Sequence, residues 1–482
     1  MPRLKRLLLS LLPLSPLSSA LTLPPVPSQQ HLSTHEDILR SYTTSLSVLQ
    51  NSFFSLPQGN WPSGIDWTTA VLGTHLAAAS GTLSQYPHTR GLSDKYFTQL
   101  VGFYYGQPVE SLKQQAYDDI LWVVLNWIEG LKTIEIREGQ RDGWTGEEWR
   151  RAWADRAWDM YQVAEKGWDE RLCGGGMVWS PWLEPYKNAI TNELYFAASI
   201  SMYHHHPYPP QNRTYLENAI KAYKWLKSSN MTNEHGLYTD GYHISKLTEG
   251  GTICDSRDEM VYTYNQGVVL TGLRGMAQAA EGTEAAGYIL EGLALIDAVL
   301  SSEGTQGELV YDGVLTEKCD PGGYCSQNSQ TFKGIFLHHL TTFCQPLSPV
   351  VATAVAKAHT LGCARYQIFM ERQAEAASST RNDAGIMGSW WGVPSGLSSS
   401  LRSTIDTRPK DTADQQNFCP KPLDAHACEA SQRLLAPTGR GDKDKARKEK
   451  GDLNDRGRGR TVESHSGGVA ALRAVLEMQR GQ

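Results

Sequence analysis

Residues 145–164 read Thr-Gly-Glu-Glu-Trp-Arg-Arg-Ala-Trp-Ala-Asp-Arg-Ala-Trp-Asp-Met-Tyr-Gln-Val-Ala, and this stretch carries the pattern that dominates the chain. Apolar residues recur in it every three or four positions, which is typical of a helix with one buried face. The residues on that face are Trp149, Trp153, Ala157, Met160, Tyr161 and Ala164. Thr145, followed three residues later by Glu148, predicts a capping box at the start of the helix.

The same periodicity continues through most of the 482 residues, and alternating strand patterns are scarce. About twelve helical segments are predicted. They begin near residues 36, 65, 92, 110, 145, 187, 213, 258, 283, 328, 348 and 466. Twelve helices suit an all-α toroid, the (α/α)6 barrel or six-hairpin fold, in which six inner helices are ringed by six outer ones. An open solenoid is the competing architecture, but the sequence shows no fixed repeat of about 34 or 40 residues.

The first twenty residues have the features of a signal peptide. A basic start at Arg3, Lys5 and Arg6 precedes the apolar run 7–17, and the small residues 18–20 follow. Residues 21–35 are expected to be a linker. No other stretch has the roughly 20 apolar residues that a membrane span needs, and the polar end of the chain argues against a lipid anchor attached through a cleaved apolar tail. The sequence therefore predicts a secreted, extracellular protein, either free or associated with a cell wall.

Residues 396–461 interrupt the helical pattern. Much of this segment, 440–460 above all, consists of Gly, Asp, Lys, Arg and Glu. Such a composition offers too little apolar surface to offset the entropy lost on ordering, so the segment is predicted to be a largely disordered insertion. The apolar spacing resumes in 462–482, which is expected to supply the final barrel helix. The alternative is that the whole end of the chain is a loose tail.

Eight cysteines are present, an even number that favours disulfides over zinc in a secreted protein. Cys319 and Cys325 flank a turn-rich loop, Asp-Pro-Gly-Gly-Tyr, that a disulfide would close. Either cysteine also has the option of a distant partner. Asn212 and Asn230 each begin an Asn-x-Thr glycosylation signal.

The net charge of −6 is spread along the chain and leaves no basic stripe, so nucleic acid is not an expected partner. Fourteen tryptophans and twenty-one tyrosines are a high aromatic content. A large core accounts for most of them. The sharper interpretation is that some line a sugar-binding cleft, where flat rings stack on pyranose faces.

Asp118 and Asp119 lie next to each other within Ala-Tyr-Asp-Asp-Ile-Leu-Trp, residues 116–122. Burial and mutual repulsion are expected to raise the pKa of at least one of these two carboxyl groups. One protonated and one ionised carboxyl is the division that glycoside hydrolysis requires. Retaining enzymes hold the two groups about 5 to 5.5 Å apart, which neighbours in sequence can meet. The alternative is a surface or helix-capping pair.

Four further motifs follow this pair in order. They are Leu-Cys-Gly-Gly-Gly-Met-Val-Trp-Ser-Pro-Trp at 172–182, Tyr-Lys-Asn-Ala-Ile-Thr-Asn at 186–192, Thr-Tyr-Asn-Gln-Gly at 263–267 and Thr-Phe-Lys-Gly-Ile-Phe at 331–336. Each is weakly specific alone, but the ordered set, with Asp118-Asp119 first, resembles glycoside hydrolase family 76. That family includes endo-α-1,6-mannanases and related fungal cell-wall enzymes. The resemblance covers roughly residues 38–395 and the final helix.

The resemblance implies a catalytic (α/α)6 domain over residues 36–395 and a retaining double displacement. It makes Asp118 the nucleophile and Asp119 the acid/base. It also implies a set of substrate-binding residues, for each of which a helix cap or a place in the core is the structural alternative: Trp122, Trp179, Asn188, Tyr264, Asn265 and Gln266. Phe332-Lys333-Gly334 is expected to fix the start of a helix rather than to contact substrate.

No cofactor and no metal site are predicted. The run 204–206 is three histidines, which cannot all face one ion, and it is interpreted as a solvated loop. The glycines 174–176 lack the following Lys-Ser/Thr of a nucleotide-binding loop. Asp258 and Glu259 are expected to be acidic residues at a helix N-terminus. The alternative is that they reach the cleft and bind substrate.

The leading functional hypothesis is a monomeric enzyme that hydrolyses α-1,6-linked mannan or another mannose-containing glycan. Transglycosylation is a second hypothesis, in which an acceptor sugar replaces water and mannose-bearing glycolipid-anchored proteins are linked to glucan. A third is a sugar-binding wall protein without activity, although retention of both aspartates argues against it.

Overall fold

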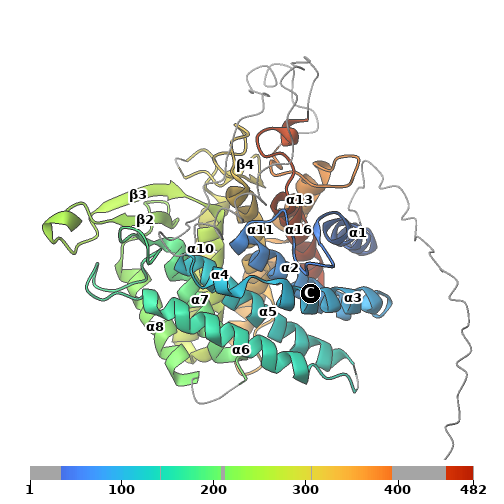
Figure 1. The fold of residues 1–482 in the computed structure, drawn as a ribbon, viewed down its shortest axis with the longest axis horizontal. Helices are drawn as coiled ribbons and strands as arrows, with labels where there is room; N and C mark the ends of the chain where they lie inside the picture. The colour runs from blue at the N-terminus through green and yellow to red at the C-terminus, as the bar shows by residue number, and fades with distance from the viewer. Residues whose placement is uncertain (1–33, 142, 208–211, 306, 393–451, 481–482) are drawn as a thin grey trace, which may run out of the picture.

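The computed structural model describes residues 34–392 and 452–480, apart from 142, 208–211 and 306 (Figure 1). Six helices form a closed inner ring in which each packs against the next and the sixth packs against the first. In chain order they are α2 (Asp66–Ser84), α5 (Tyr117–Gln140), α7 (Ala189–His205), α9 (Thr263–Ala279), α11 (Gln327–Cys344) and α16 (Val462–Arg480). The ring confirms the predicted toroid.

The outer layer consists of helices that come before or between the inner ones along the chain and pack on the outside of the ring. They are α1 (His35–Phe53), α3 (Arg90–Gly106), α6 (Glu147–Ala164), α8 (Asn212–Ser228), α10 (Gly282–Leu300), α12 (Thr353–Ala364) and α13 (Gln367–Ser379). Helix α16 closes the ring, with α1 and α13 against it. Residues 462–480, where the sequence predicts the final barrel helix, form α16.

The difference between the two layers follows from composition. Nearly every residue of α2 is buried, because it is rich in Ala, Gly, Ser, Thr and Leu and presents no charged face. Helix α6 is amphipathic, and the predicted face is buried from Trp153 to Ala164, with Trp149 partly buried. Its Trp153 lies directly on Gly130 of α5, where a Cβ atom would come within 2.7 Å of the indole. A glycine is needed there for the inner and outer helices to approach.

The predicted capping box at the start of α6 is wrong. The residue before the helix is Gly146, and Thr145 accepts only a long 3.4 Å hydrogen bond, from the backbone N–H of Glu147. The backbone N–H of Gly146 instead donates to Glu138 of α5, over 3.1 Å. Glu138, from the neighbouring helix, therefore accepts the hydrogen bond at the start of α6 in place of the local side chain that was predicted.

Other predicted helix starts are displaced along the chain. The segment expected from 110 is the four-residue α4 (Val109–Leu112) followed by a turn, and α5 begins only at Tyr117. The segment expected from 348 begins at Thr353 as α12. The histidine run ends α7 rather than forming a solvated loop, since His204 is part-buried and contacts the carbonyl of Gly275 at 2.8 Å.

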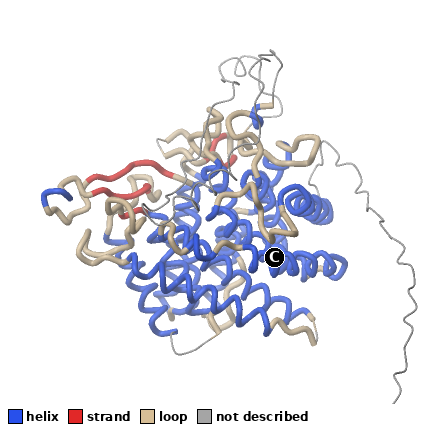
Figure 2. Tube along the Cα trace, viewed as in Figure 1, coloured by secondary structure: helices blue, strands red, loops and turns tan. Residues whose placement is uncertain are grey.

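The helix expected from about 258 begins at Thr263 as α9, and the residues before it form a strand. Strands β1 (Lys187–Asn188), β2 (Thr239–His243) and β3 (Ser256–Val261) form a small antiparallel sheet in the order β1-β2-β3, and the strands lie at the edge of the helical body (Figure 2). Asp258 and Glu259 therefore lie on β3 and not at a helix N-terminus. Strands β4 (Val310–Tyr311) and β5 (Val314–Leu315) make a second, two-stranded sheet.

Three disulfides join Cys173 to Cys254, Cys319 to Cys325 and Cys344 to Cys363. The first ties the loop after α6 to the loop between β2 and β3. The second is the predicted closure of the turn-rich loop. Cys419 and Cys428, like the predicted signal peptide, most of the linker and most of the low-complexity insertion, lie outside the described residues. Among the described helices, none combines the length and apolar character needed to cross a bilayer.

Candidate active site

A cleft with an empty volume of about 680 Å³ opens where the N-terminal ends of several inner helices meet the small sheet. It is lined almost entirely by aromatic, carboxylate and amide side chains. These are Trp67, Asp118, Asp119, Trp122, Trp179, Tyr186, Asn188, Asp240, Tyr264, Asn328 and Phe332. Six of the eight residues singled out in the sequence lie among them.

Asp118 and Asp119 occupy the first turn of α5, and both are buried, with exposed fractions of 8% and 3%. One carboxylate oxygen of Asp118 accepts from the backbone N–H of Asp119 at 3.1 Å, and the other accepts from the indole N–H of Trp179, also at 3.1 Å. Trp179 is itself held by two backbone hydrogen bonds, from its N–H to Tyr186 and from Tyr117 to its carbonyl, each 2.8 Å long. The loop after α6 thus fixes the orientation of Asp118.

The two carboxyl groups differ in how strongly they retain a proton. Burial raises the pKa of Asp118 to about 7, although its two hydrogen bonds oppose the rise because they stabilise the ionised form. Burial, the charge of Asp118 and that of Asp66 raise the pKa of Asp119 well above its ordinary range. Asp118 therefore ionises first, while Asp119 keeps its proton.

Stacked aromatic pairs form much of the cleft surface. The rings of Trp67 and Trp122 are 5.7 Å apart and inclined by 26°, and Trp67 is fixed by a 2.6 Å hydrogen bond from its indole N–H to Asn328. Tyr264 and Phe332 stack almost in parallel, at 4.0 Å and 6°. Rigid flat surfaces of this kind suit ligands with apolar faces and polar edges.

A third carboxylate, Asp240 on β2, lies in the cleft and was missed in the sequence. It accepts a 2.5 Å hydrogen bond from the hydroxyl of Tyr186. Burial, together with the charge of Asp258, raises the pKa of Asp240 to about 6. The charge of Asp240 in turn contributes to the raised pKa of Asp118.

The predicted amide residues divide into two groups. Asn188 lines the cleft, and its buried side-chain oxygen has no hydrogen-bond partner among the residues that the structure describes. Asn265 and Gln266 are fully buried and do not line the cleft. The amide of Gln266 both accepts from and donates to the backbone of Tyr238, at 2.8 and 2.9 Å, so it fixes the chain entering β2. Their prediction as substrate-binding residues is not supported, because the structure uses Gln266 as a backbone clamp and encloses Asn265.

The family model described as "Glycosyl hydrolase family 76" matches residues 77–402, about two thirds of the chain. The chain belongs to glycosyl hydrolase family 76. The mannan endo-1,6-alpha-mannosidase DFG5 of Saccharomyces cerevisiae is 29% identical over 193 residues, and DCW1 of the same yeast is 29% identical over 126 residues. The matched segments span 38% of the chain and of DFG5, and about a quarter of the chain and of DCW1.

Solved structures show that this family 76 chain shares its fold with more distant proteins. An inactive variant of the α-1,6-mannanase GH76A of Salegentibacter, in complex with α-1,6-mannotetrose, has a TM-score of 0.60 and 15% identity, covering 92% of this chain and all of the other. Dfg5 of Chaetomium thermophilum in complex with glucosamine has a TM-score of 0.59 and 16% identity, covering 94% and 93%. At such low identity the likeness establishes the toroid alone.

The Phe332-Lys333-Gly334 motif of this family 76 chain has two parts with different surroundings. Helix α11 starts at Gln327, five residues earlier, so the motif does not fix the helix start. Phe332 faces the cleft, contrary to the expectation. Lys333 forms a fully buried ion pair with Asp320 in the loop closed by Cys319 and Cys325.

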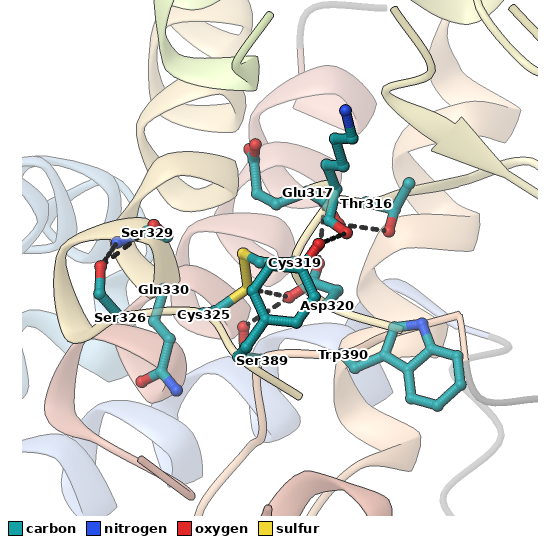
Figure 3. The surroundings of a disulfide bond; sticks show 12 residues. Thr316, Glu317, Cys319, Asp320, Cys325, Ser326, Ser329, Gln330, Ser389 and Trp390 are labelled. Atoms are coloured by element: carbon teal, nitrogen blue, oxygen red, sulfur yellow. Dashed lines mark hydrogen bonds between the residues drawn. A yellow bond between two sulfur atoms is a disulfide. The ribbon is translucent and has the colours of Figure 1, made fainter. Parts of the chain in front are cut away.

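Asp320 organises that loop (Figure 3). It also accepts from the Ser389 hydroxyl and from the backbone N–H of Glu317, each at 2.9 Å. The carboxyl group of Glu317 in turn accepts hydrogen bonds from Thr263, the first residue of α9. Lys333, the residue after Phe332, therefore stabilises a loop that links α11 to α9.

A second, narrower cavity lies within the ring on the other side of Trp122. Among the residues lining it are His75, His338 and His339, and burial lowers the pKa of each well below the ordinary histidine value. Glu129 and Lys132 pair there at 2.6 Å. Trp122 thus separates the cleft from a chamber whose histidines are neutral.

Proposed function

We propose that this protein is a secreted, monomeric, retaining glycosidase that cleaves α-1,6-mannosidic bonds in mannan. The observation that carries the proposal is the pair of buried aspartates at the cleft, with Asp118 poised to ionise and Asp119 holding its proton. Glycoside hydrolysis needs one carboxyl group in each state. Family membership supports glycosidase chemistry, and the names of the yeast relatives support α-1,6-mannan as the substrate.

In the proposed reaction, the Asp118 carboxylate attacks the anomeric carbon while Asp119 gives its proton to the departing glycosidic oxygen. The C–O bond to the leaving sugar breaks as the glycosyl–Asp118 ester forms. Asp119, now ionised, takes a proton from water, and the hydroxide equivalent displaces Asp118 from the sugar. Two inversions at the same carbon retain its configuration.

The hydrogen bonds at the pair support this assignment. Asp118 accepts from Trp179 and from the backbone, which stabilises the negative charge that a nucleophile carries. Asp119 stands beside that charge, which favours its neutral form until Asp118 becomes an ester. In the Salegentibacter mannanase, a variant with two consecutive aspartates replaced by alanine is inactive and holds α-1,6-mannotetrose. We take Asp118 and Asp119 as the corresponding pair.

The remaining cleft residues suit a sugar. Trp122 and Tyr264 offer ring faces, and the unpartnered oxygen of Asn188 would accept from a hydroxyl. Trp179 was predicted to stack on a sugar ring, but we assign it the positioning of Asp118 instead, because its indole N–H donates to that carboxylate. Asp240, with its pKa near 6, adds a further acceptor for hydroxyl groups.

The test is incubation of the purified protein with α-1,6-mannan. New reducing ends are expected, and NMR of the first product should show the α anomer. Asp118→Ala and Asp119→Ala should abolish cleavage, whereas Asp383→Asn, which removes an exposed carboxylate from a loop, should leave it unchanged. A β anomer as first product would refute the retaining mechanism, and full activity in both alanine variants would refute the site.

Azide rescue assigns the two roles separately. With an aryl α-1,6-mannobioside, Asp119→Ala with azide should give the α-configured glycosyl azide, because Asp118 still forms the ester. Asp118→Ala should give the β-configured azide by direct attack. The reverse pattern would exchange the roles. Repeating the wild-type reaction with an excess of acceptor oligosaccharide tests the transfer alternative, since hybrid products would identify a transglycosidase.

A further inference from the structure

The loop between Trp179 and Tyr186 carries an exposed tryptophan outside the cleft. Trp182 has 47% of its surface exposed, whereas most large apolar side chains of the described chain are buried. It does not line the cleft. The residues at both ends of its loop do, and the backbone N–H of Trp179 donates to the carbonyl of Tyr186 at 2.8 Å. Residues 180–185 therefore form a loop whose two ends are joined at the cleft rim.

The exposed indole is held in place. Its N–H donates to the carbonyl of Gln114 at 2.8 Å, and the backbone N–H of Trp182 donates to the hydroxyl of the buried Ser180 at 3.2 Å. Pro181 and Pro185 restrict the backbone on either side. An exposed tryptophan fixed in this way loses little conformational entropy when a ligand covers it.

Gln114 lies four residues before Asp118, so the hydrogen bond from the indole attaches Trp182 to the segment that leads into the aspartate pair. The Cα atoms of Trp179 and Trp182 are at most about 11 Å apart, because the two residues are three positions apart in the chain. Trp179 touches Asp118. A polymer whose reacting unit lies over Asp118 must leave the cleft across its rim, and Trp182 stands on that rim.

We propose that Trp182 forms an outer subsite that stacks on a mannose unit of the α-1,6-linked chain beyond those held in the cleft. This inference rests on the proposed function. The indole face supplies the flat apolar surface, and the hydrogen bond to Gln114 fixes its angle. The subsite makes the enzyme favour long chains over short ones without entering the chemistry at Asp118.

The test compares Trp182→Ala with wild type on α-1,6-mannooligosaccharides of increasing length. For the longest oligomers, kcat/KM should fall about three- to tenfold, the range that an aromatic stacking contact provides. For the shortest oligomer that is cleaved, kcat/KM should not change. Trp182→Phe keeps a ring and should recover part of the loss. Tyr105→Ala, which removes an aromatic ring 75% exposed on α3, is the matched control and should have no effect at any length.

Equal loss on short and long oligomers, or no loss on either, would overturn the subsite. Binding provides a second readout that does not depend on turnover. In the Asp119→Ala background, calorimetry with a long oligomer should show affinity weakened by the same factor when Trp182 is replaced. Failure of the wild type to cleave any oligomer would refute the proposed function, which is a separate outcome from the dependence on chain length.

Discussion

The hydrogen bond from the Trp179 indole to Asp118 makes a quantitative prediction. Trp179→Phe keeps an aromatic ring and removes the N–H donor, which lies 3.1 Å from the carboxylate oxygen. A hydrogen bond to a charged group contributes about 1.5 to 3 kcal/mol. Water in the cleft will replace part of this, so the lower value is the better guide. One pKa unit corresponds to about 1.4 kcal/mol, so the pKa of Asp118 should rise by about one unit.

The sign follows from which form the bond stabilises. The indole N–H donates to the ionised carboxylate and lowers its pKa. Its loss favours the protonated form, so the acid limb of the kcat/KM profile, which reports the first ionisation of the aspartate pair, should move to higher pH. Below the limb, at about pH 6 for example, the variant should be slower than wild type by about tenfold. The measurement is kcat/KM on an α-1,6-mannooligosaccharide across the pH range.

Trp67→Phe is the matched control. It also removes an indole N–H in the cleft, but that group donates to Asn328 and not to a carboxylate. Its acid limb should stay at the wild-type pH even if the height of the profile changes. The reasoning is refuted if Trp179→Phe leaves the limb in place or moves it to lower pH. It is also refuted if both variants move the limb equally, because the effect would then be a general one of altering the cleft.

Three more predictions follow from the buried charges. Asp118→Asn should stabilise the protein increasingly as pH rises. The pKa of this carboxyl group is about 7 in the folded state and 3.8 ordinarily, so its ionisation costs stability from about pH 4 upward. Denaturant unfolding should show a gain in the free energy of unfolding that approaches about 4 kcal/mol above pH 7 and is absent near pH 3. Asp240→Asn removes a charge that raises the pKa of Asp118, so the acid limb should move to lower pH whatever happens to the maximum rate. Lys333→Met leaves Asp320 buried without its cation and should lower the free energy of unfolding by about 3 to 5 kcal/mol. Adding Asp320→Asn to Lys333→Met should recover part of this stability. An equal loss in the single and the double variant would show that the ion pair is not the cause.

The sequence was sufficient for the ring of helices, because the signal there is local. Trp153 and Met160 of α6 are buried as their spacing predicts. The small residues of α2 make it suitable for the centre of the ring. Contacts between different elements could not be predicted from such local patterns. The backbone N–H of Gly146 donates to Glu138, which lies eight positions earlier, in the preceding helix α5.

The candidate site shows the same division. Asp118 and Asp119 were singled out because two carboxylates next to each other in an apolar stretch can be recognised from the sequence alone. Asp240 was missed because it enters the cleft only through the pairing of β2 with β1 and β3. Gln266 was misassigned because its amide is taken by the backbone of Tyr238, 28 residues away. Short strands without alternation leave no periodic signal, and they decide what faces the cleft.

The closure of the ring has a consequence for how the protein is made. Helix α2 meets α16 through contacts such as that of Thr82 with Glu477, at 2.5 Å and 395 positions apart. During synthesis, α2 cannot complete its packing until α16, near the end of the chain, has been made. Until then its largely uncharged surface stays exposed and can be bound by chaperones. Such distant pairing makes folding slow. A fragment trimmed to the family match at 77–402 would lack α16 and Trp67, so the boundaries of a practical expression fragment are set by ring closure and not by the matched segment.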